Sequence, residues 1–139
     1  MTDPPSASRE PVAPTTTVLG RAAEDSACRH LERAGLQCLV RNYRCRAGEI
    51  DLVMLDPAAR VLVLVEVRSR SRRDYGSAAA SIGPAKRRRF SLAARHLLLT
   101  RRELRSLRVR FDVVALDPPP PGASTAPQLT WLRNAFGLT

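Results

Sequence analysis

The chain has 139 residues, of which 44% are hydrophobic, and its formal net charge is +10. This length predicts a single domain with a modest core, and the charge predicts a polyanionic partner such as the phosphate backbone of a nucleic acid. No segment is apolar over the width of a membrane and no signal-peptide core is found. These two features exclude a membrane protein and favour a cytoplasmic location.

The first helix is expected directly after a disordered lead. Residues 1–18 hold four prolines among serine and threonine, so the folded domain is expected to span residues 19–139. Between Gly20 and Gly35, a natural helix stop, apolar residues recur with helical spacing at Ala23, Ala27, Leu31 and Ala34. Glu24 lies at the edge of this apolar stripe, where it either faces inward or pairs with an arginine one turn away.

Two apolar runs further along each contain one acidic residue. After a strand expected near residues 37–43, apolar side chains occupy both alternating faces of residues 50–55 and 61–67, as in strands that are covered on both sides. Asp51 and Glu66 are therefore expected to be largely buried carboxylates. Such groups must be paired, neutralised or bound to a metal.

The short connector between these runs predicts how the two acids meet. Residues 56–60 are rich in turn formers, which favours an antiparallel hairpin centred between Ala58 and Ala59 and places Asp51 opposite Glu66. Like charges in a cross-strand pair repel, and a bridging divalent cation would relieve the repulsion. Two alternatives stay open: a shifted register, or a covering arginine, for which the candidates are Arg44, Arg46 and Arg68.

The second half of the chain predicts helices and two further strands. The expected elements are a helix over 84–99, a helical turn within 101–107, strands over 109–116 and 129–132, an extended Pro-rich loop over 118–127 and a tail over 134–138. Asp112 interrupts one apolar strand and is interpreted as structural, while Glu49 either assists the acid pair or caps its strand. The whole order predicts an α/β fold with a mixed sheet flanked by helices.

The three cysteines show no spacing typical of a metal or disulfide site. Cys28, Cys38 and Cys45 contain no C-x-x-C pair, and their odd number fits a reducing interior. They are expected to act as small buried hydrophobes.

Short motifs spread over most of the chain resemble the YraN family of small bacterial proteins. The resemblance runs in order from about Leu19 to Phe136 and rests on the segments Gly20-Arg21-Ala22-Ala23-Glu24, Arg41-Asn42-Tyr43-Arg44, Gly48-Glu49-Ile50-Asp51-Leu52, Val65-Glu66-Val67-Arg68-Ser69-Arg70, Arg110-Phe111-Asp112-Val113-Val114 and Asn134-Ala135-Phe136. That family is similar in turn to the PD-(D/E)XK nuclease superfamily, with archaeal Holliday-junction resolvases among its nearer relatives. The resemblance implies a restriction-endonuclease-like fold and a nuclease-like activity.

Carried over to this chain, the resemblance implies a catalytic metal site built from three acids. Glu24, Asp51 and Glu66 would bind Mg²⁺ or Mn²⁺. Ile50 stands where the motif has proline, which is a common variation. Arg68 stands in the lysine position of the motif, and a guanidinium that stays protonated cannot act as a general base.

The departure at Arg68 leaves two interpretations of the chain's single lysine. Of 23 lysines and arginines only Lys86 is a lysine, so Arg68 also fits a general preference for arginine and would contact the scissile phosphate. Lys86 either reaches the site from the next helix and replaces the missing amine, or simply begins the basic run 86–89. The second interpretation is favoured, because a helix face is placed only loosely from sequence.

Basic residues near the acidic motifs are expected to bind nucleic acid through its phosphates, and the candidates are Arg44, Arg46, Arg70, Lys86 and Arg87. An aromatic content of 4% argues against base stacking. The predicted function is metal-dependent hydrolysis of phosphodiester bonds in structured or branched nucleic acid, with DNA favoured over RNA and a homodimer compatible with action on two strands. The alternatives are a nuclease-like protein that binds without cleaving and, with less support, a docking module for the ribosome or another partner.

Overall fold

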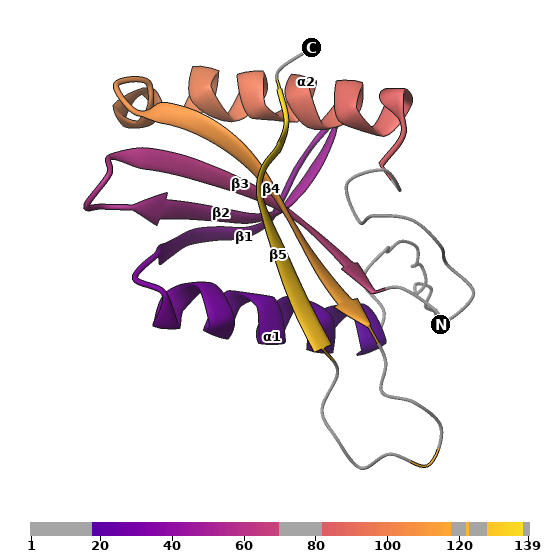
Figure 1. Ribbon diagram of the computed structural model, residues 1–139. Coiled ribbons are helices and arrows are strands. Elements are labelled where there is room, and N and C mark those ends of the chain that lie inside the picture. The colour runs from indigo at the N-terminus through magenta and orange to yellow at the C-terminus, as the bar shows by residue number, and fades with distance from the viewer. Residues whose placement is uncertain (1–17, 70–81, 118–121, 123–127, 138–139) are drawn as a thin grey trace, which may run out of the picture.

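The computed structural model describes residues 18–69, 82–117, 122 and 128–137 of the chain. In chain order the elements are helix α1 (Val18–Arg33), strands β1 (Gln37–Cys45), β2 (Gly48–Asp56) and β3 (Val61–Ser69), helix α2 (Pro84–Thr100), the 3₁₀ helix η2 (Arg102–Leu104), and strands β4 (Arg108–Asp117) and β5 (Gln128–Phe136) (Figure 1). The predicted helices and strands are all present in the predicted order.

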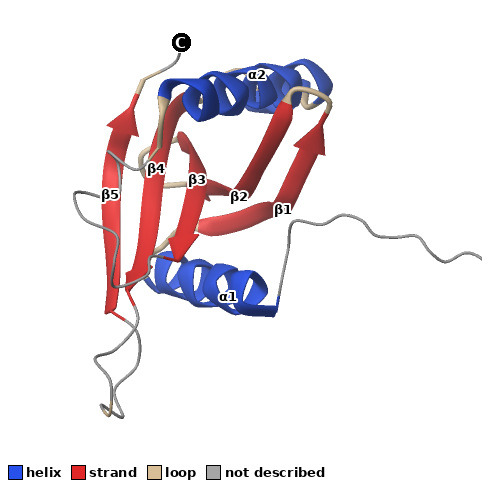
Figure 2. Cartoon of the chain, turned by 90° about the vertical axis from the view of Figure 1, so that its right-hand side faces the viewer, coloured by secondary structure: helices blue, strands red, loops and turns tan. Residues whose placement is uncertain are grey.

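The five strands form one sheet in the order β1-β2-β3-β4-β5. Neighbours pair antiparallel except β3 and β4, which are parallel because the chain passes from one to the other through α2. Helix α1 covers one face of the sheet and α2 covers the opposite face (Figures 1 and 2). The predicted α/β class, a mixed sheet flanked by helices, is confirmed.

Each face of the sheet has its own hydrophobic core. Beneath α2, the Phe90 ring packs edge-on against Phe111 and Phe136, with centroid distances of 5.3 and 5.6 Å. Beneath α1, Ala27 and Leu31 are fully buried against the other face. The apolar stripe predicted for the first helix is therefore the one that packs on the sheet.

The alternation of side chains along β2 breaks at Asp51. Leu52 and Met54 pack on the α1 side, whereas Ile50 packs together with Val53 on the α2 side. Strict alternation would put Ile50 with Leu52 and Met54. The side chains of β2 therefore change face at Asp51, between the part of the strand that ends at Ile50 and the part that begins at Leu52.

The register predicted for the acidic hairpin is confirmed. Strands β2 and β3 pair from Asp56↔Val61 to Leu52↔Val65, which centres the hairpin between Ala58 and Ala59.

The prediction of a tail from Asn134 was wrong for the residues before Gly137, because β5 continues to Phe136. Asn134 has a φ of 53°, and its pairing with β4 shifts register before it resumes at Phe111↔Phe136. An asparagine tolerates this left-handed conformation, so it bends the strand instead of ending it.

Two predicted segments fall largely beyond the described residues. Only Val18, which begins α1, belongs to the predicted lead, and only Gly122 belongs to the predicted Pro-rich loop. Among the helices of the described ranges, none has the length and apolar character needed to span a membrane. The three cysteines are free thiols, Cys28 being buried and the other two half-buried.

Candidate functional site

A cavity of about 490 Å³ opens where α1, the β1–β2 turn, the end of β3 and the start of α2 meet. The three acids implied by the motifs, Glu24, Asp51 and Glu66, all line it, and their residues are only 7%, 8% and 4% exposed. Glu49 and Lys86 complete its charged walls. The fold therefore brings residues from both helices and from the acidic hairpin to one hollow.

Asp51 lies where β2 and β3 stop pairing. The last backbone pair is Leu52↔Val65, and the next step of that register sets Asp51 opposite Glu66. There the Asp51 carboxylate accepts a hydrogen bond of 2.8 Å from the Val67 N–H. The side chain takes the place of a backbone acceptor, which fixes the carboxyl group between the two strands.

The carboxyl groups of Asp51 and Glu66 are in contact, as the register predicts, and each makes ionisation of the other less favourable. Burial, and then the charge of Glu66, raises the pKa of Asp51 to about 8, although the bond from Val67 favours the charged form. Burial also raises the pKa of Glu66 in spite of Lys86, and its carboxyl group hydrogen-bonds that of Asp51. Near neutral pH the pair retains a proton that a divalent cation would displace.

Helix α2 brings Lys86 directly to this pair. Its Nζ atom lies 3.1 Å from Glu66 Oε2. The favoured interpretation, in which Lys86 only begins a basic run, therefore does not describe its position. Gly48 permits the approach, because a Cβ at that position would lie 2.9 Å from the backbone oxygen of Arg89, so α2 packs directly on the start of β2.

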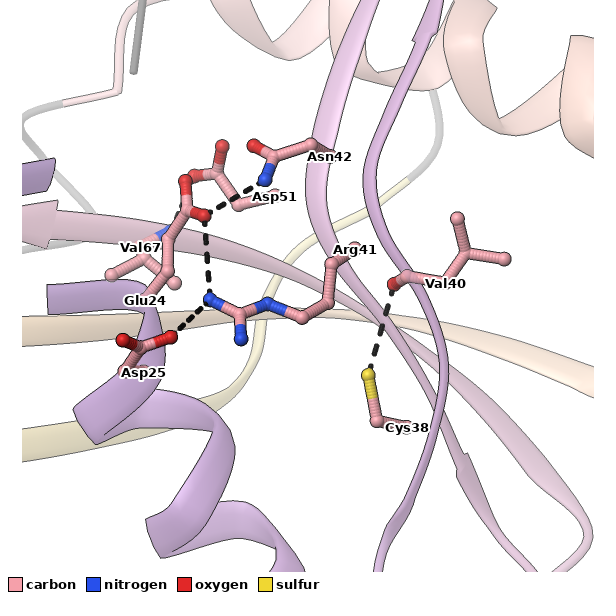
Figure 3. Close-up of polar contacts among 8 residues, drawn as sticks. All are labelled: Glu24, Asp25, Cys38, Val40, Arg41, Asn42, Asp51 and Val67. Atoms are coloured by element: carbon pink, nitrogen blue, oxygen red, sulfur yellow. Dashed lines mark hydrogen bonds and ion pairs between the residues drawn. The ribbon is translucent and has the colours of Figure 1, made fainter. Parts of the chain in front are cut away.

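Glu24 faces the same cavity from α1 and is held by residues of β1. The Asn42 Nδ2 group donates a hydrogen bond of 3.0 Å to Glu24 Oε1, and Arg41 Nη2 lies 3.7 Å from the same oxygen (Figure 3). Arg41 lies closer to Asp25, at 2.7 Å. Glu24 therefore points inward, and its cationic neighbour comes from the adjacent strand instead of from one turn away on its own helix.

Two of the predicted phosphate-binding arginines form a basic rim, one in the cavity wall and one in the adjoining β1–β2 turn. Arg44 lines the cavity, and its Nε atom is 3.8 Å from Glu49 Oε1. Arg46 is exposed in the turn between β1 and β2. These two positions suit contacts to a phosphate backbone that approaches the hollow from solvent.

The other predicted cations are placed differently. Arg87 donates from Nε to the Ile82 carbonyl at 2.9 Å and stacks 5.4 Å from the centroid of the Phe136 ring, so it supports the packing of α2. Arg68 is half-buried and lowers the pKa of Glu66, but it is not among the described residues that line the cavity. Arg70 lies outside the described residues.

Each acid of the cavity is held by a group of the protein itself. Within the described ranges, no three His, Cys, Asp or Glu side chains are grouped closely enough to hold a metal ion. Asp51 binds the Val67 N–H, Glu66 binds Lys86 and Glu24 binds Asn42. The donor set nonetheless fits Mg²⁺ or Mn²⁺, because these hard cations prefer carboxylate oxygens and would relieve the repulsion between Asp51 and Glu66.

Asn42 is the residue at this site to which the sequence assigned no role. Its Oδ1 atom is buried and finds no hydrogen-bond partner in the described part of the chain. The backbone pairs Arg41↔Leu52 and Tyr43↔Ile50 place it opposite Asp51. The signal was available in the short turn before Gly48, which fixes this register, and in the rarity of asparagine inside strands.

Comparison with known proteins places these residues within a shared region. A sequence model described as Uncharacterised protein family UPF0102 matches residues 23–116. The chain is 53% identical over 123 residues to a UPF0102 protein of Cupriavidus taiwanensis, a match that covers 88% of this chain and 86% of that protein. It is 50% identical over 122 residues to one of Dechloromonas aromatica, covering 88% and 91%, and 43% identical over 119 residues to one of Herminiimonas arsenicoxydans, covering 86% of each.

Proposed function

The chain belongs to the UPF0102 family, the YraN family that its motifs resemble, and we propose that it is a metal-dependent nuclease-like protein that hydrolyses phosphodiester bonds in structured or branched nucleic acid. Its net charge of +10 supports a polyanionic substrate. The likeness of its motifs to the PD-(D/E)XK nucleases supports the reaction class.

The contact between the Asp51 and Glu66 carboxyl groups is the observation that carries this proposal. Two buried acids in contact weaken a fold, since one of them must stay protonated up to a pKa of about 8. A perturbed pair of this kind inside a cavity is typical of sites that bind a cation or perform proton chemistry. A purely structural acid has no need of such a neighbour.

In this proposal Glu24, Asp51 and Glu66 hold a Mg²⁺ or Mn²⁺ ion, which would polarise the phosphodiester and activate water. Glu24 would bind the ion with the oxygen that Asn42 does not use, Glu66 would give up its contact with Lys86, and Asp51 would keep its bond to the Val67 N–H. The rim residues Arg44 and Arg46 orient the nucleic-acid backbone through its phosphates.

Lys86 is better positioned than Arg68 to supply the amine of the motif. Its Nζ atom lies 3.1 Å from Glu66 Oε2 at the cavity wall, and its side chain is 40% exposed and so accessible to substrate. With a cation held by Glu66, the Lys86 ammonium would be free to donate to the phosphate oxygen on which charge develops. Arg68 then acts on the site through its charge near Glu66.

A non-catalytic nucleic-acid-binding protein is the second candidate. The observation in its favour is that all three acids already have protein partners, together with a guanidinium in the lysine position. In that case the basic rim would bind nucleic acid while the acids merely shape the hollow.

The test is a cleavage assay on duplex, four-way junction and flap substrates, each made in DNA and in RNA, with Mg²⁺ or Mn²⁺. We expect metal-dependent nicking of at least one branched DNA substrate and its loss in Asp51→Asn. Glu103→Gln is the matched control, because it removes an acid that is 62% exposed and far along the chain in η2. Binding without cleavage by the wild type would support the second candidate, and absence of both would end the nucleic-acid proposal.

The role of Lys86 is tested against a neighbour of equal charge. Lys86→Ala should abolish cleavage, whereas Arg88→Ala should reduce substrate affinity alone, because Arg88 is exposed on the same helix. Arg87 is unsuitable as the control because it packs on Phe136. Equal effects of the two alanine variants on the cleavage rate of bound substrate would exclude a special role for Lys86.

A further inference from the structure

The amide of Asn42 contains a buried hydrogen-bond acceptor that no described residue uses. Its Nδ2 group donates to Glu24 Oε1 at 3.0 Å, while its Oδ1 atom is buried without a partner in the described ranges. The orientation of the amide is determined by Glu24, because the flipped amide would point its oxygen at a carboxylate oxygen. A buried carbonyl oxygen left in this state requires an explanation, such as a water or an ion that joins it.

The backbone at Asn42 is also displaced from ordinary strand geometry. Its φ is 55°, which is left-handed, although it lies in the middle of β1. Within β1 this conformation turns the side chain away from the position that a regular strand would give it. Figure 3 shows the resulting direction, with the Asn42 amide turned toward the carboxyl groups of Glu24 and Asp51.

The register of the sheet gives independent support for this position. The pairs Arg41↔Leu52 and Tyr43↔Ile50 flank Asn42 and put it opposite Asp51 across β1 and β2. Asp51 in turn contacts Glu66 across β2 and β3. Asn42 therefore lies between Glu24, to which it donates, and Asp51, directly behind two of the acids that line the cavity, although Asn42 itself is not among the described lining residues.

We propose that Asn42 is an oxygen ligand of the divalent cation, an inference that rests on the metal site proposed above. Side-chain amide oxygens are ordinary ligands of hard cations such as Mg²⁺ and Mn²⁺. A neutral ligand adds coordination without adding to the repulsion among the carboxylates. The role also explains the left-handed backbone, which aims Oδ1 at the ion, and the unused acceptor, which the ion satisfies.

The first test is an NMR titration with Mg²⁺ of protein labelled with ¹⁵N at the asparagine side chains. The sequence contains two asparagines, Asn42 and Asn134, so the spectrum holds one reporter at the site and one internal control. Asn134 is exposed on β5, at the opposite end of the strand order from β1. We expect the Asn42 amide signals to shift with Mg²⁺ at saturation while those of Asn134 stay in place.

The second test measures Mn²⁺ affinity by calorimetry in Asn42→Gly and Asn134→Gly. Glycine keeps the left-handed backbone that both positions share, with φ values of 55° and 53°, so each variant removes only the side chain. Asn42→Gly should bind Mn²⁺ about 10-fold more weakly than the wild type, within the range typical for partners of a metal site. Asn134→Gly should bind with wild-type affinity.

The outcomes separate this inference from the metal site itself. If the wild type binds Mn²⁺ and Asn42→Gly binds equally well, or if the Asn42 signals do not respond to Mg²⁺, Asn42 is not a ligand and the carboxylate site stands. If the wild type binds neither ion, the metal site and the role of Asn42 are both refuted. A fold defect in Asn42→Gly would appear in its unfolding curve, and the NMR titration of the wild type then decides.

Discussion

Asp51 and Asp112 occupy two regions of the sheet that are alike in backbone geometry. Each acid interrupts an apolar strand at a break in pairing: beyond Leu52↔Val65 for Asp51, and at a register shift between β4 and β5 for Asp112. Each accepts a hydrogen bond from a backbone N–H of the next strand, from Val67 at 2.8 Å and from Asn134 at 2.9 Å. In both places a carboxylate replaces a missing backbone acceptor.

The two regions differ in what else surrounds the carboxylate. Asp112 is fully buried and also accepts two bonds of 2.9 Å from Arg110 and one of 2.8 Å from the Trp131 indole. These donors satisfy the Asp112 carboxylate within the sheet, as expected for a structural acid. Asp51 instead contacts a second acid, Glu66, beside a cavity. A carboxylate surrounded by donors stabilises the fold, whereas one beside another carboxylate weakens the fold and is available to a ligand.

The largest expected effect is the loss of the structural acid. Asp112→Ala should lower the free energy of unfolding by about 3–5 kcal/mol, because it leaves the Arg110 guanidinium and the Trp131 N–H partly buried without their acceptor. Urea denaturation followed by circular dichroism measures this difference. Adding Arg110→Ala should restore part of the loss, since no charge is then left unpaired. A loss below about 1 kcal/mol would show that Asp112 does not stabilise the fold more than Asp51 does.

The next effect is a pH dependence caused by Asp51. Its folded pKa of about 8 lies above the ordinary value of 3.8, so between these limits the folded state binds a proton that the unfolded state does not. The contribution of the protonated Asp51 to the free energy of unfolding is therefore full below about pH 4 and is lost as the pH rises through about 8. Asp51→Asn cannot become charged and should lack this loss.

The measurement is the unfolding free energy of wild type minus that of Asp51→Asn, taken with EDTA from about pH 5 to about pH 9. The difference should fall by on the order of 3 kcal/mol, which is less than the full shift implies because the strands can separate and hydrate the pair. Subtraction removes the titration of all other groups. A flat difference would mean that Asp51 ionises in the folded state as it does in water.

The sequence predicted the strand register that sets Asp51 opposite Glu66. A five-residue connector and strand alternation predicted its register with Glu66, because hairpin pairing follows from local turn geometry. For Glu24, the periodicity of one helix left an inward position and a pairing with an arginine of the same helix both open, and the structure shows the inward position.

The surroundings that depend on packing between layers were not predicted. Lys86 was assigned to a surface run, because the rotation of α2 on the sheet depends on packing between layers, including the close approach of the Arg89 backbone to Gly48, which no local pattern reveals. Asn134 was assigned to a tail, because its left-handed backbone breaks the strand pattern while continuing the strand. Local rules thus predicted the pairing of the acids, whereas the contact with Lys86 depends on how α2 packs on the sheet.

A third prediction tests whether a cation bound at the Asp51–Glu66 pair stabilises the fold. Mn²⁺ at about a hundred times its Kd should raise the unfolding free energy by about 2.7 kcal/mol, and EDTA should reverse the gain. The gain should increase from about pH 6 to about pH 8, as binding no longer has to displace a proton from the Asp51–Glu66 pair. Asp51→Asn should lose the gain, while a conservative change at exposed Glu103 should leave it intact. Equal stabilisation of Asp51→Asn would place the ion elsewhere.

The smallest effect concerns Asp25, a partly exposed acid next to Glu24 in the chain. Arg41 Nη2 lies 2.7 Å from Asp25 Oδ1 and 3.7 Å from Glu24 Oε1, with the Asp25 side chain 43% exposed. Because exposed ion pairs contribute little, Asp25→Asn should change the unfolding free energy by about 0.5 kcal/mol or less. Arg41 would then be free to move toward Glu24 and compete with the cation, so Mn²⁺ affinity should fall about two- to threefold. If Asp25→Asn loses Mn²⁺ affinity while keeping its stability, Asp25 holds Arg41 at the surface and so keeps it away from Glu24 in the cavity. Unchanged affinity would mean that Asn42 alone determines the direction of the Glu24 carboxylate.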